Sequence, residues 1–311
     1  MSVPFAERVT RHPSISAARR LALGGWRQAA RTPHCPDTPR LDGARALVTG
    51  GSRGIGLATS QGLAERGAQV WMASRDARSG ASVARELAQR SAGDAHFLAL
   101  DLADLDAIAH SLDALAEQLA PGRPLDLFVA NAGLWPTRYA RSAQGHEVAF
   151  ATNVLGHQAL LQGAIARGLL ADNARVIFVT GDIYILASEC TPDFRYRTPL
   201  GGQLAYCRSK LGNLWQAREW AERRPDLRVH AVHPGVIASE LGVSGAAGLK
   251  RAIMLPLAAG AQTTLFCATQ PELTSGSYYH NVLGRVELDP RDPAANAAGA
   301  KALWECLEDL R

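Results

Sequence analysis

The sequence is short of three things: long apolar runs, closely spaced cysteines and an apolar N-terminal leader. No uninterrupted apolar stretch approaches the ~20 residues that a membrane-spanning helix needs, so no such helix is expected. The five cysteines are scattered and odd in number, which favours a reducing compartment and argues against a disulfide framework or a cysteine metal site. Charge and glycine interrupt the segment from Ala17 to Trp26, so a secretory signal is not expected. We therefore expect a cytoplasmic protein without a bound metal.

Net positive charge is confined to the N-terminal segment. The whole chain carries +4, but residues 1–40 hold seven arginines against two acids, which leaves the remainder slightly negative. A broad basic surface for nucleic acid is therefore not expected. Residues 14–31 can form an amphipathic helix, which permits contact with a membrane surface. Packing on the chain's own domain, or a frayed tail, is the favoured interpretation.

Two irregular stretches divide the chain. Pro33, Pro36 and Pro39 precede the first regular pattern, which predicts a basic extension over residues 1–40 and one domain over residues 41–311. In residues 240–256, glycines alternate with apolar residues. We interpret this second stretch as an apolar lid over a substrate site, with a surface helix pair covering the sheet edge as the alternative.

The remaining pattern alternates short apolar runs with longer helical segments. Such alternation predicts βαβ units, and strands that read as continuous apolar runs are typical of a parallel sheet covered on both faces. We therefore expect a single-domain α/β protein with a Rossmann-type, doubly wound sheet of about seven strands. The expected strands are 46–49, 69–73, 96–100, 125–130, 176–180, 229–232 and 277–281, and the expected helices are 55–66, 77–90, 105–119, 145–170 and 204–223.

A glycine cluster follows the first of these strands. Gly50, Gly54 and Gly56 lie where the strand ends and a helix begins. Glycine permits close backbone approach, and a helix N-terminus offers N–H groups to an anion, so this loop is expected to hold a pyrophosphate.

A tyrosine and a lysine are spaced four residues apart on a predicted helix. Tyr206 and Lys210 therefore share one face of that helix. A nearby ammonium lowers the pKa of a phenol, which makes Tyr206 a candidate proton donor. Together with the glycine loop, the pair predicts a nicotinamide-dependent oxidoreductase.

The segment from Thr49 to Gly56 resembles the T-G-x-x-x-G-x-G signature of the short-chain dehydrogenase/reductase family, and further motifs extend the resemblance over residues 43–310. The resemblance implies an adenine contact after the third strand, a supporting turn after the fourth and a nicotinamide-side loop after the sixth. The cofactor-binding residues that it implies are Gly50, Ser52, Arg53, Gly54, Ile55, Gly56, Arg75, Asp101, Leu102, Asn131, Ala132, Gly133, Tyr206, Lys210, Pro234, Gly235, Val236 and Ser239.

The end of the second strand indicates which nicotinamide cofactor is used. NAD-binding folds normally carry an acid there for the ribose 2′-hydroxyl, whereas this chain has Ser74 followed by Arg75. A guanidinium suits a 2′-phosphate, and Arg53 in the glycine loop adds a second positive charge. NADP(H) is therefore the expected cofactor.

The resemblance also implies a catalytic set that this chain carries incompletely. Tyr206 and Lys210 match the family's proton donor and its partner, and Asn153 matches the asparagine of its proton relay. The family's catalytic serine position holds Gly181. Thr180 is the candidate catalytic residue that partly replaces the serine, although strand alternation points its side chain the other way; Asp182 is the other polar neighbour.

Motifs around Tyr206 look closest to the retinol-dehydrogenase-like branch, which implies a largely apolar carbonyl or alcohol substrate. Trp135, Tyr184 and the lid are candidates for lining its pocket. The leading hypothesis is an NADPH-dependent oxidoreductase of a CH–OH or C=O group. The alternatives are an NADP(H)-binding regulator or partner subunit without turnover, and an enzyme whose substrate supplies the missing hydroxyl. By analogy with the family, a homo-oligomer is expected.

Overall fold

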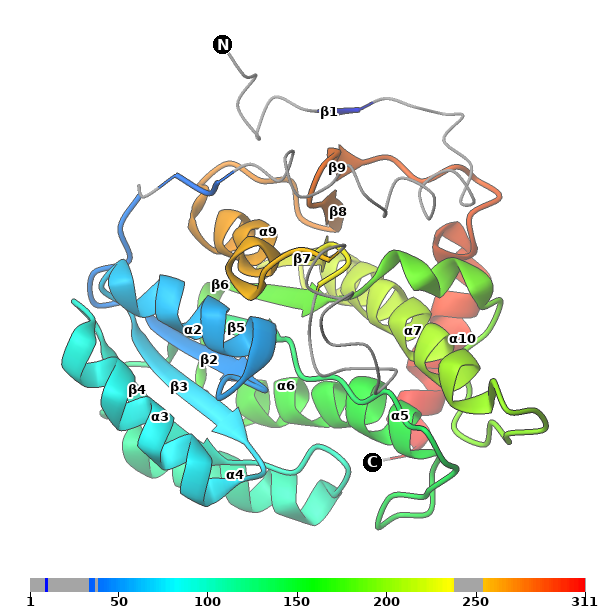
Figure 1. Ribbon diagram of the computed structural model, residues 1–311, viewed down its shortest axis with the longest axis horizontal. Helices are drawn as coiled ribbons and strands as arrows, with labels where there is room; N and C mark the ends of the chain where they lie inside the picture. Colours follow the sequence, from blue (N-terminus) through cyan, green and yellow to red (C-terminus); the bar gives the residue numbers. More distant parts are fainter. Residues whose placement is uncertain (1–8, 11–33, 37–38, 238–253, 311) are drawn as a thin grey trace.

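The computed structural model describes residues 9–10, 34–36, 39–237 and 254–310. Ser239 and residues 240–253 of the predicted lid lie outside these ranges. Within the described part, a central sheet is covered by helices on both faces (Figure 1).

The sheet has nine strands in the order β1-β9-β8-β7-β6-β5-β2-β3-β4. Seven of them, from β8 to β4 in that order, are mutually parallel and correspond to the seven predicted runs. The prediction missed the two short strands at one edge, where β9 runs antiparallel to β8 and β1 pairs with β9. The bounds are β1 Val9–Thr10, β2 Arg45–Thr49, β3 Gln69–Ser74, β4 Asp94–Ala99, β5 Leu125–Ala130, β6 Leu170–Val179, β7 Arg228–His233, β8 Ser277–His280 and β9 Gly284–Val286.

Alternate residues of the central strands face two separate cores. On β2, Leu47 belongs to one core, whereas Ala46 and Val48 belong to the other. The first core packs against α4, α6, α7 and α10, and the second packs against α2, α3 and α9. The α-helices are α2 Gly54–Glu65, α3 Ala77–Arg90, α4 Leu105–Gln118, α5 Val148–Phe150, α6 Gly156–Ala166, α7 Gly201–Arg223, α9 Leu257–Thr269 and α10 Ala297–Asp309.

The long central helix is interrupted where Asn153 lies. Instead of one helix over 145–170, α5 passes into a π-helical turn, η2 (Ala151–Leu155), which continues into α6. A π-turn changes the hydrogen-bonding partners of its carbonyl groups, and such turns often occur at functional sites. Two 3₁₀-helices, η3 (Asp182–Leu186) and η4 (Pro293–Ala295), complete the described elements.

The described part of the N-terminal segment contacts the domain at two places. The backbone of β1 pairs with β9, and the backbone N–H of Cys35 donates to Gln262 of α9. The Arg66 guanidinium, just after α2, donates to the carbonyls of Cys35 and Pro36. For these residues the contacts favour packing on the chain's own domain.

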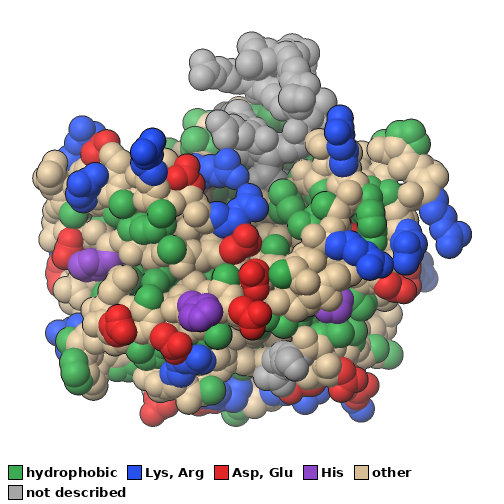
Figure 2. Space-filling view, turned by 90° about the horizontal axis from the view of Figure 1, so that it is seen from below, with side chains coloured by type: hydrophobic (Ala, Val, Ile, Leu, Met, Phe, Trp, Pro, Cys, Tyr) green, Lys and Arg blue, Asp and Glu red, His purple; other side chains and the backbone are tan. Residues whose placement is uncertain are grey.

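The helices and the surface can be compared with what membranes and nucleic acids require of a partner. In the described ranges, no helix is both long enough and apolar enough to cross a membrane. On the face drawn in Figure 2, basic and acidic side chains of the described residues are intermixed. Such mixing is not the single-sign surface that nucleic-acid binding favours.

Candidate active site

The glycine loop lies where the strand order reverses. β2 pairs with β3 on one side and β5 on the other, so the segments that follow β2 and β5 diverge at their carboxyl ends. Ligands of doubly wound sheets bind in such a crevice. The Thr49 to Gly56 loop and the turn that begins at Asn131 both start there.

The loop is shaped to receive a phosphate group. Gly54 has φ +58°, and a Cβ added there would meet no heavy atom within 4 Å, so this side of the loop is open. A Cβ on Gly56 would lie 2.1 Å from the Gly50 carbonyl oxygen, which explains why only glycine fits there. α2 begins at Gly54 with no acidic residue in its first turn, and its N-terminus favours an anion. These residues fit the pyrophosphate of a dinucleotide.

Hydrogen bonds tie this loop to the turn after β5. The Asn131 side chain donates to the Thr49 carbonyl at 2.8 Å, and the backbone N–H groups of Asn131 and Ala132 donate to the Thr49 hydroxyl at 2.9 and 3.0 Å. A Cβ on Gly133 would lie 3.5 Å from Lys210 Nζ. The predicted cofactor turn therefore connects the glycine loop with the lysine.

The predicted 2′-phosphate end is exposed and lies at the end of β3. Arg53 and Arg75 are both exposed. The serines that precede them are joined, because the Ser52 hydroxyl donates to the Ser74 hydroxyl at 2.9 Å. The Asp76 carboxylate, next to Arg75 in the sequence, accepts the N–H groups of Arg78 and Ser79 that begin α3. These bonds lower the pKa of Asp76.

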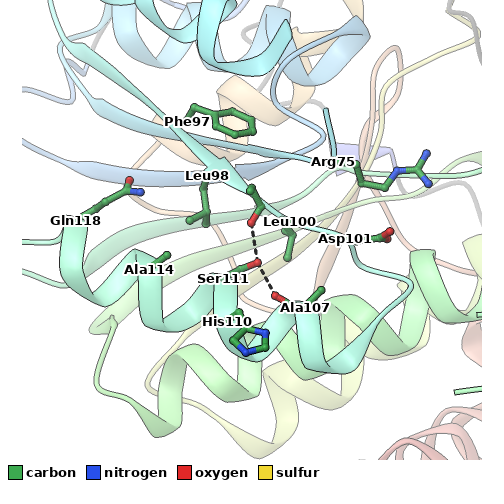
Figure 3. A pocket seen from close by; sticks show the side chains of 11 residues that line it. Arg75, Phe97, Leu98, Leu100, Asp101, Ala107, His110, Ser111, Ala114 and Gln118 are labelled. Carbon is green, nitrogen blue, oxygen red and sulfur yellow. Dashed lines mark hydrogen bonds between the residues drawn. The ribbon is translucent and has the colours of Figure 1, made fainter. Parts of the chain in front are cut away.

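An open groove of about 700 Å³ adjoins this end, between β4 and α4 (Figure 3). Arg75 and Asp101 lie at one end of it, and Gln118 lies at the other. The Asp101 carboxylate accepts the Ala103 N–H at 2.9 Å, and Leu102 is buried. A Cβ on Gly156 would lie 2.2 Å from the Leu102 carbonyl oxygen, so this glycine lets α6 approach the predicted adenine site.

Lys210 lies in the interior on α7. Its side chain is 3% exposed, and Nζ donates to the Val179 carbonyl at 2.8 Å and to Asn213 Oδ1 at 3.3 Å. Burial lowers the pKa of Lys210 to about 7, because a buried ammonium loses hydration. The lysine therefore changes charge near neutral pH.

Tyr206 lies one helical turn before Lys210, as the spacing predicts. Lys210 Nζ lies 5.5 Å from the centroid of its ring. The Trp135 indole stacks on the same ring, with centroids 4.7 Å apart and planes inclined by 13°. Burial, and to a smaller extent Cys207, raises the pKa of Tyr206, so the phenol is protonated at neutral pH. The expectation that the lysine lowers this pKa is therefore wrong for this arrangement, because burial outweighs any effect of the ammonium.

Asn153 is fully buried, and its side chain fixes the loop that carries Trp135. Its Oδ1 accepts the Leu134 N–H at 2.7 Å, and its Nδ2 donates to the Leu134 carbonyl at 3.0 Å and the Ser209 hydroxyl at 2.8 Å. These bonds give Asn153 a structural role, in positioning the loop beside Tyr206, and its role in a proton relay stays a prediction.

The end of β6 brings Thr180 and Gly181 to different surroundings. The Thr180 hydroxyl donates to the Lys210 carbonyl at 2.8 Å, which joins β6 to α7. Gly181 has an extended φ of −168°, and a Cβ added there would meet only Ile183, at 3.9 Å. A catalytic role for Thr180 stays a prediction, and its hydroxyl proton is engaged by the helix backbone in this arrangement.

Asp182 lies in a buried cluster with His233 and His280. Burial alone would raise the pKa of Asp182, but His233, His280 and Tyr278 outweigh it and hold that pKa well below its usual range. The Tyr278 hydroxyl lies 2.5 Å from one carboxylate oxygen, and His280 Nε2 lies 3.1 Å from the other. Asp182 is therefore an ionised anchor between the end of β6 and β8, and it is not a protonated donor that could replace the missing serine.

The same cluster has the composition of a metal site, since its ligand atoms lie within 4.8 Å of one another. However, His280 Nδ1 accepts the N–H groups of Val282 and Leu283 at 3.1 and 3.3 Å, which leaves the ring proton on Nε2. A metal ligand at Nε2 would have to lose that proton while Nδ1 is unprotonated as well. The bonds fit a hydrogen-bonded cluster better than a metal centre.

The predicted nicotinamide-side loop follows His233. Pro234 is buried and Val236 is 40% exposed. Gly235 has φ +98°, and a Cβ there would crowd the Asn281 side chain at 2.6 Å. Ser239, the last predicted residue of this loop, lies outside the described residues. Tyr184, by contrast, is fully buried and donates to Asp292 at 3.0 Å, so it belongs to the core and the expectation that it lines a substrate pocket is wrong.

Besides Ser209, which accepts from Asn153, sequence reasoning missed two polar residues that contact the predicted catalytic residues. Asn213, three residues after Lys210, contacts both that lysine and the Asn153 carbonyl. His157 contacts the same carbonyl and the Thr49 hydroxyl. The spacing of Asn213 from Lys210 places both on one helix face and was a usable signal; nothing in the spacing of His157 indicated Thr49.

Comparisons with known proteins agree with this geometry. Residues 44–249 match the family described as short chain dehydrogenase. Human retinol dehydrogenase 12 is 34% identical over 287 residues, covering 89% of each chain. The structure of an uncharacterized Mycobacterium paratuberculosis protein has a TM-score of 0.69 and 30% identity, covering 89% of this chain and 97% of that one. Pseudomonas aeruginosa RhlG, in an active-site complex with NADP, has a TM-score of 0.52 and 29% identity, covering 65% and 75%.

A glycine loop at the switch point, with a tyrosine and a lysine on one helix beside it, defines an oxidoreductase with a dinucleotide fold. The chain belongs to the short-chain dehydrogenase family. Its similarity to retinol dehydrogenases extends over most of its length.

Proposed function

We propose that this protein is an NADPH-dependent oxidoreductase that acts on the carbonyl or alcohol group of a largely apolar substrate. The observation that carries the proposal is the placement of Tyr206 and Lys210 on one face of α7, with Lys210 next to the Gly133 turn. A phenol and a titratable ammonium next to the loop that fits a dinucleotide support the proposal, because the phenol can serve as the proton donor.

NADP(H) is proposed because of the residues at the end of β3. Arg53 and Arg75 provide guanidinium groups for a 2′-phosphate, and Ser74 provides no carboxylate to repel it. The NADP complex of the related RhlG structure supports the same choice. Asp101 and Leu102 would hold the adenine, and the Gly50 to Gly56 loop would hold the pyrophosphate.

The catalytic roles follow from the protonation states in the site. When bound, the nicotinamide supplies or accepts a hydride at the substrate carbon. Tyr206, kept protonated by burial, donates its proton to the carbonyl oxygen during reduction and takes one back from the alcohol during oxidation. Lys210 stabilises the resulting phenolate when it is charged. Asn153 holds the Leu134 backbone and thereby the wall formed by Trp135.

The position of the missing serine limits the expected rate. Loss of one hydrogen-bond donor to a developing oxyanion costs about 10²–10³ in turnover. Gly181 supplies no hydroxyl, so a slow enzyme, or one whose substrate supplies its own hydroxyl, is proposed.

An apolar substrate is proposed from the surroundings of Tyr206. The Trp135 ring covers one face of the phenol. Two exposed apolar side chains, Leu200 and Leu204, come shortly before the tyrosine in the sequence. Such surfaces favour an apolar ligand over a strongly charged one.

The test is titration with NADPH and NADH by fluorescence, followed by a panel of apolar aldehydes and ketones monitored by absorbance of the reduced nicotinamide. Tight NADPH binding with oxidation supports the proposal. Binding without oxidation of any panel member would favour the alternative, a non-catalytic NADP(H)-binding subunit, for which Gly181 is the specific observation.

A cytoplasmic location and a homo-oligomer remain proposals. The C-terminal helix α10 packs along α7, where Trp304 contacts Trp220 edge to face at 5.1 Å. An oligomer formed through α7 would therefore use the surface that α10 leaves uncovered, and light scattering of the purified chain tests it.

A further inference from the structure

A buried chain of hydrogen bonds joins the start of the glycine loop to Lys210. The Thr49 hydroxyl lies 2.9 Å from His157 Nε2, and His157 Nδ1 lies 3.0 Å from the Asn153 carbonyl oxygen. The same carbonyl accepts Asn213 Nδ2 at 2.7 Å, and Asn213 Oδ1 accepts Lys210 Nζ at 3.3 Å. The three middle members are each at most 2% exposed, so water does not compete for these bonds.

The carbonyl acceptor determines the tautomer of His157. A carbonyl oxygen only accepts, so the proton of the neutral ring must be on Nδ1, and Nε2 presents a lone pair. The Thr49 hydroxyl has two acceptors within reach, His157 Nε2 at 2.9 Å and the Val129 carbonyl oxygen at 3.2 Å, and its own oxygen accepts the N–H groups of Asn131 and Ala132. With the ring proton on Nδ1, the shorter contact to Nε2 is a hydrogen bond only if the hydroxyl donates it. Burial lowers the pKa of His157 to about 4, so the ring is neutral at physiological pH and is not an acid or base.

The π-turn makes the Asn153 carbonyl available to two side chains. Asn153 lies within η2, where the regular α-helical pairing of carbonyl groups is interrupted. Its carbonyl oxygen accepts from His157 on one side and from Asn213 on the other. The next carbonyl, that of Val154, accepts Gln216 at 3.1 Å, so side chains of α7 hold the turn in place.

We propose that His157 and Asn213 are positioning residues that couple the cofactor loop to Lys210 through the Asn153 carbonyl group. His157 orders Thr49, and Thr49 orders the Asn131 turn against which the dinucleotide would lie. Asn213 orders the Lys210 ammonium. The inference deepens the proposed function and rests on it for the catalytic part, whereas the cofactor-binding part does not require turnover.

The test uses three variants of the full chain. His157→Leu removes both bonds, and His157→Gln retains one donor and one acceptor. His230→Leu is the matched control, because His230 is also 1% exposed with a pKa lowered to about 4, and it lies in β7 against Tyr279. Binding of NADPH is followed by fluorescence, and kcat and KM are measured with decanal.

We expect His157→Leu to weaken NADPH binding about tenfold and to lower kcat about tenfold, because a buried hydrogen bond is lost. The KM for decanal should stay within about twofold of the wild-type value. For His157→Gln, NADPH affinity and kcat should stay within about threefold of the wild-type values, and for His230→Leu within about twofold. Equal NADPH affinity and equal kcat in the two leucine variants would overturn the proposal. If the natural chain turns over no carbonyl, the proposed function fails, and NADPH affinity still tests the coupling.

A double-mutant cycle addresses the shared carbonyl. Asn213→Leu combined with His157→Leu should lose less NADPH affinity than the product of the two single losses, because both residues act on one group. Losses that multiply independently would contradict the coupling.

The tautomer gives a readout without any ligand. In ¹⁵N-histidine NMR, with His157→Gln used for assignment, the His157 ring should carry its proton on Nδ1 between pH 6 and 8. A proton on Nε2 would contradict the proposed hydrogen bonds, in which Nδ1 donates to the Asn153 carbonyl and Nε2 accepts from the Thr49 hydroxyl.

Discussion

The indole ring of Trp135 lies flat against the phenol ring of Tyr206, with 4.7 Å between centroids and 13° between planes. The two residues come from the turn after β5 and from α7, and the contact depends on Asn153, which bonds both backbone groups of Leu134. A proton donor in this position is shielded from water on one face. Such shielding disfavours the phenolate, which is the physical reason for the raised pKa of Tyr206.

Replacing Trp135 by alanine should therefore lower the pKa of Tyr206 toward its ordinary value. Alcohol oxidation needs the phenolate, so kcat/KM for oxidation rises with pH as Tyr206 loses its proton. In Trp135→Ala the midpoint of this rise should lie about one pH unit lower than in the wild-type protein. Trp135→Phe retains a stacking ring and serves as the control, with a shift of less than about half as much. A profile that stays in place, or moves to higher pH, would contradict the shielding account.

The Gly181 position has room for the missing hydroxyl. Its backbone is extended, and an added Cβ makes only an ordinary contact with Ile183 at 3.9 Å. Gly181→Ser should fold normally and raise kcat for simple apolar carbonyls by up to about a hundredfold. Gly181→Ala is the matched control and should give no gain.

The outcome at Gly181 also separates the alternatives. A lower rate on the natural substrate in Gly181→Ser would indicate a substrate that supplies its own hydroxyl. No gain on any carbonyl would favour a protein without turnover.

The arginines near the end of β3 should distinguish NADPH from NADH. Arg75→Ala should weaken NADPH binding about 10–100-fold, because a charge-assisted bond to the 2′-phosphate is lost, and NADH binding should change less than about twofold. Arg90→Ala, at the exposed far end of α3, is the control. Equal losses for both cofactors would contradict the assignment of Arg75.

Burial of Lys210 should make the stability of the protein depend on pH. Its pKa falls from 10.5 in the unfolded chain to about 7, so between these values the unfolded chain holds a proton that the native protein lacks. Stability from this group therefore rises with pH across that window. Lys210→Met should be more stable than the natural chain at pH 6, by a few kcal/mol at most, and this advantage should shrink as pH rises from 7 to 10.

Denaturant unfolding at several pH values measures the Lys210 effect. Lys301→Met is the control, since Lys301 is 66% exposed and should show no such dependence. An advantage of Lys210→Met that is constant or grows with pH would contradict the desolvation account.

The parallel strands were predictable from the sequence because each is buried on both faces and reads as a continuous apolar run. The same burial concealed α9: it has apolar or buried residues around most of its circumference, so it shows no helical period. α10 carried a usable signal that was missed, since Asn296 caps it and Ala300, Leu303 and Leu307 lie on one face. The π-turn was not predictable, because it depends on side chains of α7 that bond its carbonyl groups.

The candidate site was predictable where chemistry follows local spacing. Tyr206 and Lys210 share a helix face at four residues' separation, and the glycines lie between a strand and a helix. The Trp135 stack and the His157 bridge join residues far apart in the chain, and only the packed sheet brings them together.

The measurement that tests the central claim most directly is transfer of deuterium from NADPH deuterated at both C4 positions to an apolar aldehyde, with Tyr206→Phe run in parallel. The account predicts an alcohol that carries one deuterium on its carbinol carbon. It also predicts a rate at least about 100-fold lower in Tyr206→Phe, with NADPH affinity changed little, because the proton donor is lost and the binding loop is not. Bound NADPH with no label in any product, or an undiminished rate in Tyr206→Phe, would contradict the account.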